Sequence, residues 1–389
     1  MAALASLSID VISPAFAAIQ TALGLSAGQM GLTTASFMAG FAVAQALIGP
    51  ASDLTGRRPA ALAGMGVFAL ATAGCAASTG LPGLLAGRFA AGLGAGTCMA
   101  LAYAIARDLA GSEVRARIAA IGLVFTVTPL LAPLAGSAIL RLAPWPAVFA
   151  LVALGGAGLA AWAACTLPQT AAAAPRGAGW GRRLAAQYRM ALGHHEFRRW
   201  VVLDALSFAG MFAVVAAAPL VFLDGFGLSP TGFSLLFAVT AAGSAAGAWA
   251  AARWAARGVA ASLPLDAGLA GACGGAALLL LLLLSLLGVL CGVTGALACA
   301  VLFSGICLCR SIAMPSLVHA ALRPLAEAAG TAAGLVGFLE TAAAAAASAL
   351  VALGFAAFGT AGVAAILLAL TALPLGLWRR IPAACRAAL

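Results

Sequence analysis

The sequence contains twelve apolar segments, each long enough to cross a membrane as a helix. They lie near 1–23, 31–51, 60–79, 82–105, 118–140, 146–167, 199–223, 230–252, 264–287, 293–320, 328–354 and 360–378. A spanning helix needs about 20 mostly apolar residues, and a helix satisfies its own backbone hydrogen bonds inside lipid. Only 8% of the residues are charged, too few to solvate a soluble surface. The sequence predicts an all-α membrane protein and argues against a soluble enzyme, a nucleic-acid-binding domain or a disordered chain.

The arginines predict how these segments are oriented. The chain has 20 basic residues, all of them Arg. If both termini lie inside, seventeen of these Arg fall on the inside, Arg141 falls outside, and Arg88 and Arg310 fall within segments. Lys and Arg concentrate in cytoplasmic loops of membrane proteins. We therefore expect an even number of spans with both termini in the cytoplasm, and we attribute the net charge of +10 to this bias.

An Arg-rich polar stretch at 168–198 divides the twelve segments into two sets of six. We expect an N-terminal six-helix bundle over 1–167, a basic cytoplasmic central loop over 168–198, and a second six-helix bundle with a short tail over 199–389. Nine Cys are scattered through the chain and none has metal-ligand spacing with His. Free Cys behaves as a small hydrophobe, so we expect no metal site and no cofactor.

Asp10 and Arg88 are charges that fall inside predicted spans. Asp10 is the only charged residue among the first fifty. Low dielectric disfavours the charged form of a carboxylate, so Asp10 can exchange a proton, as a coupling site requires; the alternative is a cap near the helix end. Arg88 inside a membrane costs about 2.5 kcal/mol or more and needs a polar partner. Its alternative is an arginine that snorkels to the outer surface.

Further charges occur in the second half of the chain. Arg310 and Glu340 fall in the tenth and eleventh segments, and we expect them to pair because each alone would be costly. The pair can be structural or can serve a substrate or proton. Asp204 lies about five residues into its segment and is expected at the cytoplasmic end. Candidate substrate-cavity residues, for each of which ordinary packing is the alternative, are Phe37, Tyr103, Phe208, Met211, Arg310 and Glu340.

Two motifs carry further information. The second connection reads Gly49-Pro-Ala-Ser-Asp53-Leu-Thr-Gly56-Arg57-Arg58. Gly56 permits a tight turn, and the Asp53 carboxylate suits the start of the following helix. Asp108, at the inner end of the fourth segment, is a candidate ionic partner for Arg57. The fifth segment contains Gly122, Pro129, Pro133 and Gly136, and its two prolines predict a bent helix.

Together these motifs resemble the major facilitator superfamily. The Gly49–Arg58 connection resembles that family's signature loop, which latches the two halves, and Arg88 matches a family position implicated in proton coupling. The fifth segment resembles the antiporter motif of exporting members, although Ala132 and Ser137 stand where glycine is usual. The resemblance implies two pseudo-symmetric six-helix bundles with a site at the midplane between them.

A narrower resemblance is to the bicyclomycin/chloramphenicol-resistance (Bcr/CflA) drug exporters. It rests on Asp10-Val-Ile-Ser-Pro14-Ala and on the Ser-Phe-Ala-Gly-Met-Phe string at 207–212. It implies a monomeric inner-membrane transporter that exports small amphipathic drugs in exchange for protons and binds no nucleic acid. The alternatives are a permease or exporter of a metabolite such as a sugar or amino acid, and a membrane-embedded enzyme, which the dispersed acids and three His disfavour.

Overall fold

The computed structural model describes residues 1, 3–109, 114–169, 180–285, 293–324 and 329–382. Some side chains within helices also lie outside the described part, including those of Asp53, Tyr103 and Asp108. The first seven elements are α1 (Ala3–Asp10), the 3-10 turn η1 (Ser13–Ala15), α2 (Phe16–Leu23), α3 (Ala27–Thr55), α4 (Arg57–Ala76), α5 (Leu81–Leu109) and α6 (Val114–Leu142). The others are α7 (Pro146–Thr166), α8 (Trp180–Gly193), α9 (His195–Pro219), the π-helical η3 (Leu220–Gly225), α10 (Pro230–Ala256), α11 (Ser262–Ser285), α12 (Val293–Leu322) and α13 (Ala329–Arg379).

The twelve-span, all-α prediction is confirmed. Within the described residues, ten helices are long and apolar enough to cross a membrane. One of them, α13, is two spans that meet at Gly359, whose φ of 61° and ψ of −145° break the helix. The described apolar part of α6, Val127–Leu142, is shorter than a full span. Dividing α13 at Gly359 and including α6 gives the twelve expected spans.

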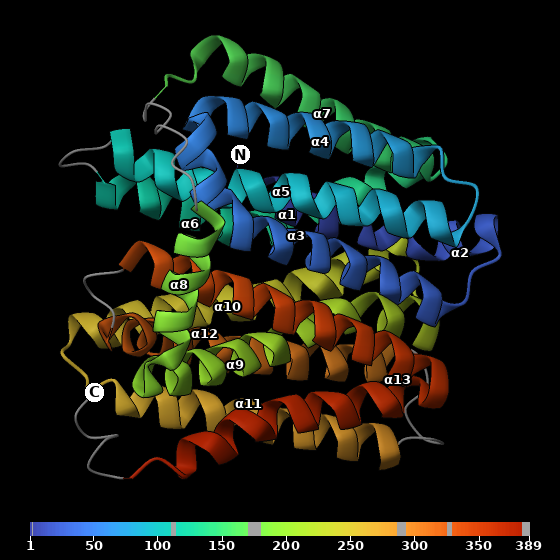
Figure 1. Cartoon of the computed structure of the whole chain (residues 1–389). Coiled ribbons are helices and arrows are strands. Elements are labelled where there is room, and N and C mark those ends of the chain that lie inside the picture. The colour runs from blue at the N-terminus through green and yellow to red at the C-terminus, as the bar shows by residue number, and fades with distance from the viewer. Residues whose placement is uncertain (2, 110–113, 170–179, 286–292, 325–328, 383–389) are drawn as a thin grey trace.

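The spans lie side by side along one direction and form two groups (Figure 1). Helices α1 to α7 occupy the upper part of the view, and α9 to α13 the lower part. The groups meet where α3 packs on α13 and where α6 packs on α10. The two-bundle fold is therefore as expected, while the boundaries at 167/168 and 198/199 stay predictions. Inside the central stretch, the helix α8 is a feature that the sequence analysis did not anticipate.

Small residues bring α3 and α13 close together. A Cβ placed on Gly28 would lie 2.7 Å from the Cβ of Ala356, and one placed on Gly31 would lie 2.8 Å from the Cβ of Ala352. Small residues allow the backbones of membrane helices to approach in this way. The α3 helix begins at this contact because Ser26 caps it, with the Ser26 hydroxyl accepting from the Gln29 amide at 3.2 Å. We call this contact the α3–α13 seam.

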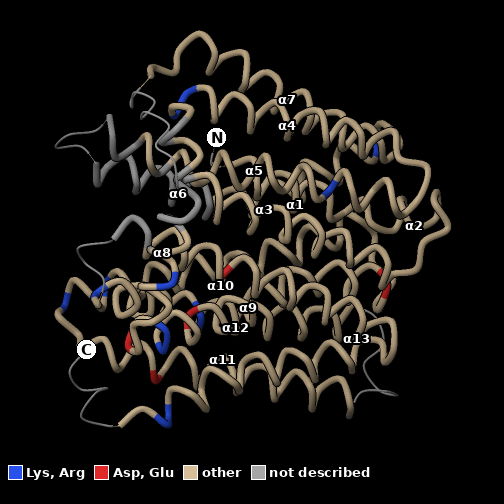
Figure 2. Tube along the Cα trace, in the orientation of Figure 1, with Lys and Arg blue, Asp and Glu red and all other residues tan. Residues whose placement is uncertain are grey.

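Arginines gather at one end of the bundle, which we call the basic end (Figure 2). The α3–α4 and α10–α11 connections and the end of α13 lie at this end (Figure 1). The α3–α13 seam lies toward the opposite end, where two polar contacts also join the groups. Gln20 Nε2 donates to Asp224 Oδ2 at 3.2 Å, and Arg141 Nη2 donates to Thr231 Oγ1 at 3.0 Å.

Candidate functional site

Asp10 is the last residue of α1, directly before a break in the first span. Pro14 explains the break, because proline has no N–H to donate to the carbonyl four residues earlier, which is that of Asp10. The chain continues through the 3-10 turn of η1 into α2. Asp10 is only 4% exposed. Within the described part of the chain, its carboxylate forms no hydrogen bond and no ion pair, so a buried acid is left without a fixed partner at a discontinuous helix.

The proline-containing helix α6 packs closely against this break. A Cβ on Gly136 would lie 2.0 Å from the carbonyl oxygen of Val11 and 3.3 Å from Cγ of Pro14. Only glycine fits there without displacing the backbone of the first span. Both Pro129 and Pro133 lie inside α6, and the Pro133 carbonyl accepts from Ser234 Oγ of α10 at 2.8 Å. The antiporter-like segment therefore touches the Asp10 break on one side and the second half of the chain on the other; the surroundings of Gly122 lie outside the described residues.

Arg88 is buried, with 3% of its surface exposed, and is held by α1 and α3. Its Nη1 donates to the Ser8 carbonyl oxygen at 2.9 Å and to Ser8 Oγ at 2.8 Å. The guanidinium carbon lies 4.4 Å from the ring centroid of Phe37, a cation–π distance. Arg88 therefore has the polar partner that the sequence analysis required and does not snorkel to the surface.

Asp10 and Arg88 both touch α1 but are not paired with each other. Arg88 contacts Ser8, and residues two apart on a helix do not face the same side. The α1 helix packs on α5, which carries Arg88, and also on α6, whose Gly136 lies against Val11. We infer that the acid and the base occupy different sides of one short helix, so a movement of α1 changes the surroundings of both.

A second buried charge cluster lies in the other half of the chain. Arg310 Nη2 lies 3.0 Å from Asp204 Oδ1 and 3.7 Å from Glu340 Oε1. The expected approach of Arg310 to Glu340 is thus observed, but the expectation that Asp204 lies at the cytoplasmic end is wrong. Asp204 is completely buried, because α9 begins at His195 and places it more than two turns inside the helix. We call Asp204, Arg310 and Glu340 the charge triad.

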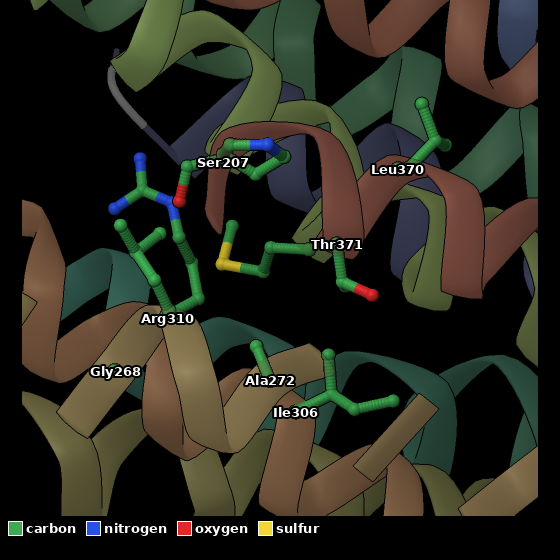
Figure 3. A pocket seen from close by; sticks show the side chains of 10 residues that line it. Ser207, Gly268, Ala272, Ile306, Arg310, Leu370 and Thr371 are labelled. Atoms are coloured by element: carbon green, nitrogen blue, oxygen red, sulfur yellow. The ribbon is translucent and has the colours of Figure 1, made fainter. Parts of the chain in front are cut away.

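A small cavity adjoins the triad. Its lining includes Ser207, Met211, Arg310 and Thr371. Figure 3 shows the Arg310 side chain extending toward Ser207. Of the proposed cavity residues, Met211 and Arg310 therefore do line a common space, whereas Phe37 is fully buried beneath Arg88.

The other proposed cavity residues lie elsewhere. Phe208 stacks on Phe212 with ring centroids 6.2 Å apart, and its ring centroid lies 6.0 Å from the guanidinium carbon of Arg310. Glu340 belongs to the charge triad. The side chain of Tyr103 lies outside the described residues.

The connection between α3 and α4 is a turn at Gly56, whose φ is 89°. Arg57 Nη1 donates to the Ser52 hydroxyl, and Arg58 Nη2 donates to the carbonyl of Ala164 on α7. Within the described contacts, the two arginines therefore tie the turn to its own half of the chain. The surroundings of Gly49 and the side chains of Asp53 and Asp108 lie outside the described part of the structure, so the proposed Arg57–Asp108 pair stays a prediction.

Two members of these clusters were missed by sequence reasoning. Ser8 has no distinguishing feature in an apolar segment, and only its place two residues before Asp10 could have drawn attention to it. Asp204 was placed at a helix end because the start of its segment was put at Arg199, directly after the polar stretch. The extra helical turn at His195–Arg198 is capped by His194, whose Nδ1 accepts from the Phe197 amide at 3.5 Å.

The fold is a bundle of helices long and apolar enough to cross a membrane, and it buries charged residues at two places. Sequence comparison identifies the family. A model of the Major Facilitator Superfamily matches residues 1–348. The chain belongs to this superfamily and is a multi-pass membrane protein.

Two curated relatives illustrate the likeness within that superfamily. An uncharacterized transporter of the superfamily from Bacillus subtilis, YdgK, is 31% identical over 242 residues, covering 61% of this chain and 60% of that protein. The multidrug resistance protein MdtL of Escherichia coli is 29% identical over 234 residues, covering 60% of this chain and 59% of MdtL. The matches thus span about three fifths of the relatives' length.

Solved structures share the fold at low sequence identity. A D-xylose–proton symporter superposes with a TM-score of 0.76 at 18% identity, covering 98% of this chain and 96% of the symporter. A POT family transporter, solved in complex with a thioalcohol-conjugated peptide, gives 0.74 at 14% identity, covering 98% of this chain and 92% of that one. At such identities the likeness establishes the superfamily fold and carries no information on substrate.

Proposed function

We propose that this protein is a secondary active exporter that moves small amphipathic drugs out of a bacterial cell in exchange for protons. It would work by alternating access, in the inner membrane, with both termini in the cytoplasm and with the proton gradient in place of any cofactor. The likeness to MdtL supports drug export, and the motifs around Asp10 and Ser207 support the Bcr/CflA group. A monomer is the expected working unit.

The observation that carries the proposal is the unpaired, buried Asp10 at the break in the first span. A buried carboxylate without a counter-ion is most stable when protonated, and it can give up the proton when its surroundings become wet or positively charged. The break lets α1 and α2 change their relative angle, and the close contact at Gly136 couples that change to α6. Asp10 would thus bind a proton in one state of the transporter and release it in the other.

Arg88 would assist this exchange from the other side of α1. Its contacts with the Ser8 backbone and side chain keep a positive charge beside the segment that carries Asp10. A positive charge that approaches Asp10 would stabilise the ionised acid and promote proton release. The loop from Asp53 to Arg58 would stabilise the outward-facing state.

The test is substrate-induced proton release in inside-out vesicles, measured over a panel of drugs, sugars and amino acids. We expect wild-type protein to release protons on addition of amphipathic drugs, and the Asp10→Asn variant to bind drug but release none. Glu196→Gln, which changes an exposed acid in the first turn of α9, is the matched control and should behave as wild type. Equal proton-coupled transport by Asp10→Asn would remove Asp10 from the mechanism. Movement of a sugar or amino acid alone would replace the exporter by a metabolite permease.

A further inference from the structure

The charge triad contains two acids and one base, in a region almost closed to solvent. The side chains of Arg310 and Asp204 are 2% and 0% exposed, and that of Glu340 is 16% exposed. With all three ionised, the cluster would carry one uncompensated negative charge. Uncompensated charge buried in low dielectric is costly, and two carboxylates that share one site do not readily ionise together.

The hydrogen bonds of the triad are also incomplete. Asp204 Oδ2 and Glu340 Oε1 are buried without a hydrogen-bond partner, and so are Nε and Nη1 of Arg310. Both carboxyl groups approach the same atom, Arg310 Nη2, and therefore share one site. A carboxylate can only accept, so two ionised carboxylates cannot satisfy each other. One proton on the pair turns one of them into a donor, which neutralises the cluster and supplies a missing hydrogen bond.

The neighbouring charged residues do not change the net charge of the triad. Within the described residues, the ion pairs of the triad are those of Arg310 with Asp204 and with Glu340. Helix α11, which packs on α12 and α13, contributes Asp266, whose Oδ1 accepts from Trp378 Nε1 at 2.6 Å. The neutral form of the triad is therefore one ion pair and one protonated acid.

We propose that Asp204, Arg310 and Glu340 form a second proton-binding site, in the C-terminal half of the protein, with Glu340 as the group that takes up and releases the proton. Asp204 has the shorter contact with Arg310 and no exposure, so it is the ionised partner. Glu340 has the longer contact and the only appreciable exposure of the three, so a proton reaches it most directly. This site does not depend on drug export and would exist in a carrier of any substrate.

The experiment counts protonated carboxyl groups in purified protein by infrared difference spectroscopy, without substrate or vesicles. All variants are made on the Asp10→Asn chain, which removes the acid that is buried outside the triad in the described part of the protein. We expect one protonated carboxyl band in the parent chain and its loss in Glu340→Gln. Asp204→Asn should also lose it, because the remaining acid then pairs with Arg310. Arg310→Met should show two such bands, and the exposed-site control Glu196→Gln should keep one.

The outcome of this experiment is decisive in either direction. A parent spectrum without a protonated band, or a band that survives both Glu340→Gln and Asp204→Asn, would overturn the proposal. If Arg310→Met does not fold, the two conservative neutral variants still decide the question. Because the measurement needs no transport, failure of the drug-export assay leaves this result intact, and failure here leaves the role of Asp10 intact.

Discussion

The two halves of this protein each bury one arginine on their fourth span, and each arginine contacts the first span of its own half. In the N-terminal half, Arg88 on α5 is held by Ser8 on α1. In the C-terminal half, Arg310 on α12 is held by Asp204 on α9 and approached by Glu340 on α13. The buried arginine of the fourth span therefore faces acids in the C-terminal half, at Arg310, and a neutral serine in the N-terminal half, at Arg88.

The arginines also differ in depth. Arg88 is seven residues from the start of α5 and Arg310 is seventeen from the start of α12. At about 1.5 Å per residue, Arg310 lies about 15 Å farther from the start of its own helix than Arg88 lies from the start of α5. The two halves therefore share the span that carries a buried arginine, but they differ in the partner of that arginine and in its distance from the start of the helix.

The comparison predicts that removing Arg310 is far more damaging than removing Arg88. Arg310→Met leaves two acids buried without a base, and we expect a loss of about 3–5 kcal/mol in the free energy of unfolding. Arg88→Met leaves no buried acid against it and should lose at most about 2 kcal/mol. Thermal and denaturant unfolding in detergent would measure both, with the exposed Arg257→Met as control. Equal losses would mean that the acids of the triad do not need Arg310.

A second contrast concerns one glycine at a helix contact in each half. Gly136 of α6 faces the first span of its half, whereas Gly210 lies on α9, the first span of the other half, and faces α13. A Cβ on Gly136 would meet the Val11 carbonyl at 2.0 Å, whereas a Cβ on Gly210 of α9 would meet nothing closer than 3.4 Å. We expect Gly136→Ala to destabilise by about 1–3 kcal/mol through overpacking. Gly210→Ala should be neutral or slightly stabilising, because alanine is the better helix former. The same unfolding assay applies, and a tolerated Gly136→Ala would show that α1 and α6 are free to separate.

Ser8 contacts Arg88 in the N-terminal half as Asp204 contacts Arg310 in the C-terminal half, but Ser8 carries no charge. Ser8→Ala removes the hydroxyl contact but keeps the backbone carbonyl that Arg88 also uses, so we expect a loss of about 1 kcal/mol. Ser8→Asp, in contrast, would recreate the acid–base pair of the other half and should fix Arg88 to α1 and slow proton-coupled transport. Unchanged transport rates in Ser8→Asp would show that the charge of Arg88 does not need to be free.

The smallest expected difference lies in the aromatic contacts. Phe37 is 4.4 Å from the Arg88 guanidinium, whereas Phe208 is 6.0 Å from that of Arg310. Double-mutant cycles in which each Phe is changed to Leu and each Arg to Met would measure the coupling energy of the two pairs. We expect about 0.5–1 kcal/mol for Phe37 with Arg88 and less for Phe208 with Arg310. A larger coupling at Phe208 would mean that its ring moves closer to Arg310 in another state.

Much of the fold could be predicted from the sequence, because apolar length and the distribution of arginines depend on local residues alone. The residues that carry charge into the membrane were also recognisable, since Asp10, Arg88, Arg310 and Glu340 stand out against apolar neighbours. Their partners were not. Ser8 is one of many small polar residues, and the role of Asp204 depends on where α9 begins, which a capping His194 decides. Which face of a helix meets which neighbour depends on three-dimensional packing, so neither partner could be read from spacing.

The α3–α13 seam has a consequence for how easily the molecule can change shape. Glycine and alanine have no side-chain rotamers that must rearrange. Separating α3 from α13 at these residues therefore exposes no large side chain and opens only a shallow gap. The polar links that would break beside it, Gln20 to Asp224 and Arg141 to Thr231, are weak ones of about 1 kcal/mol each. Two arrangements of the halves can then lie within a few kcal/mol of each other. A single proton or substrate molecule that binds one arrangement more tightly is enough to tip such a balance.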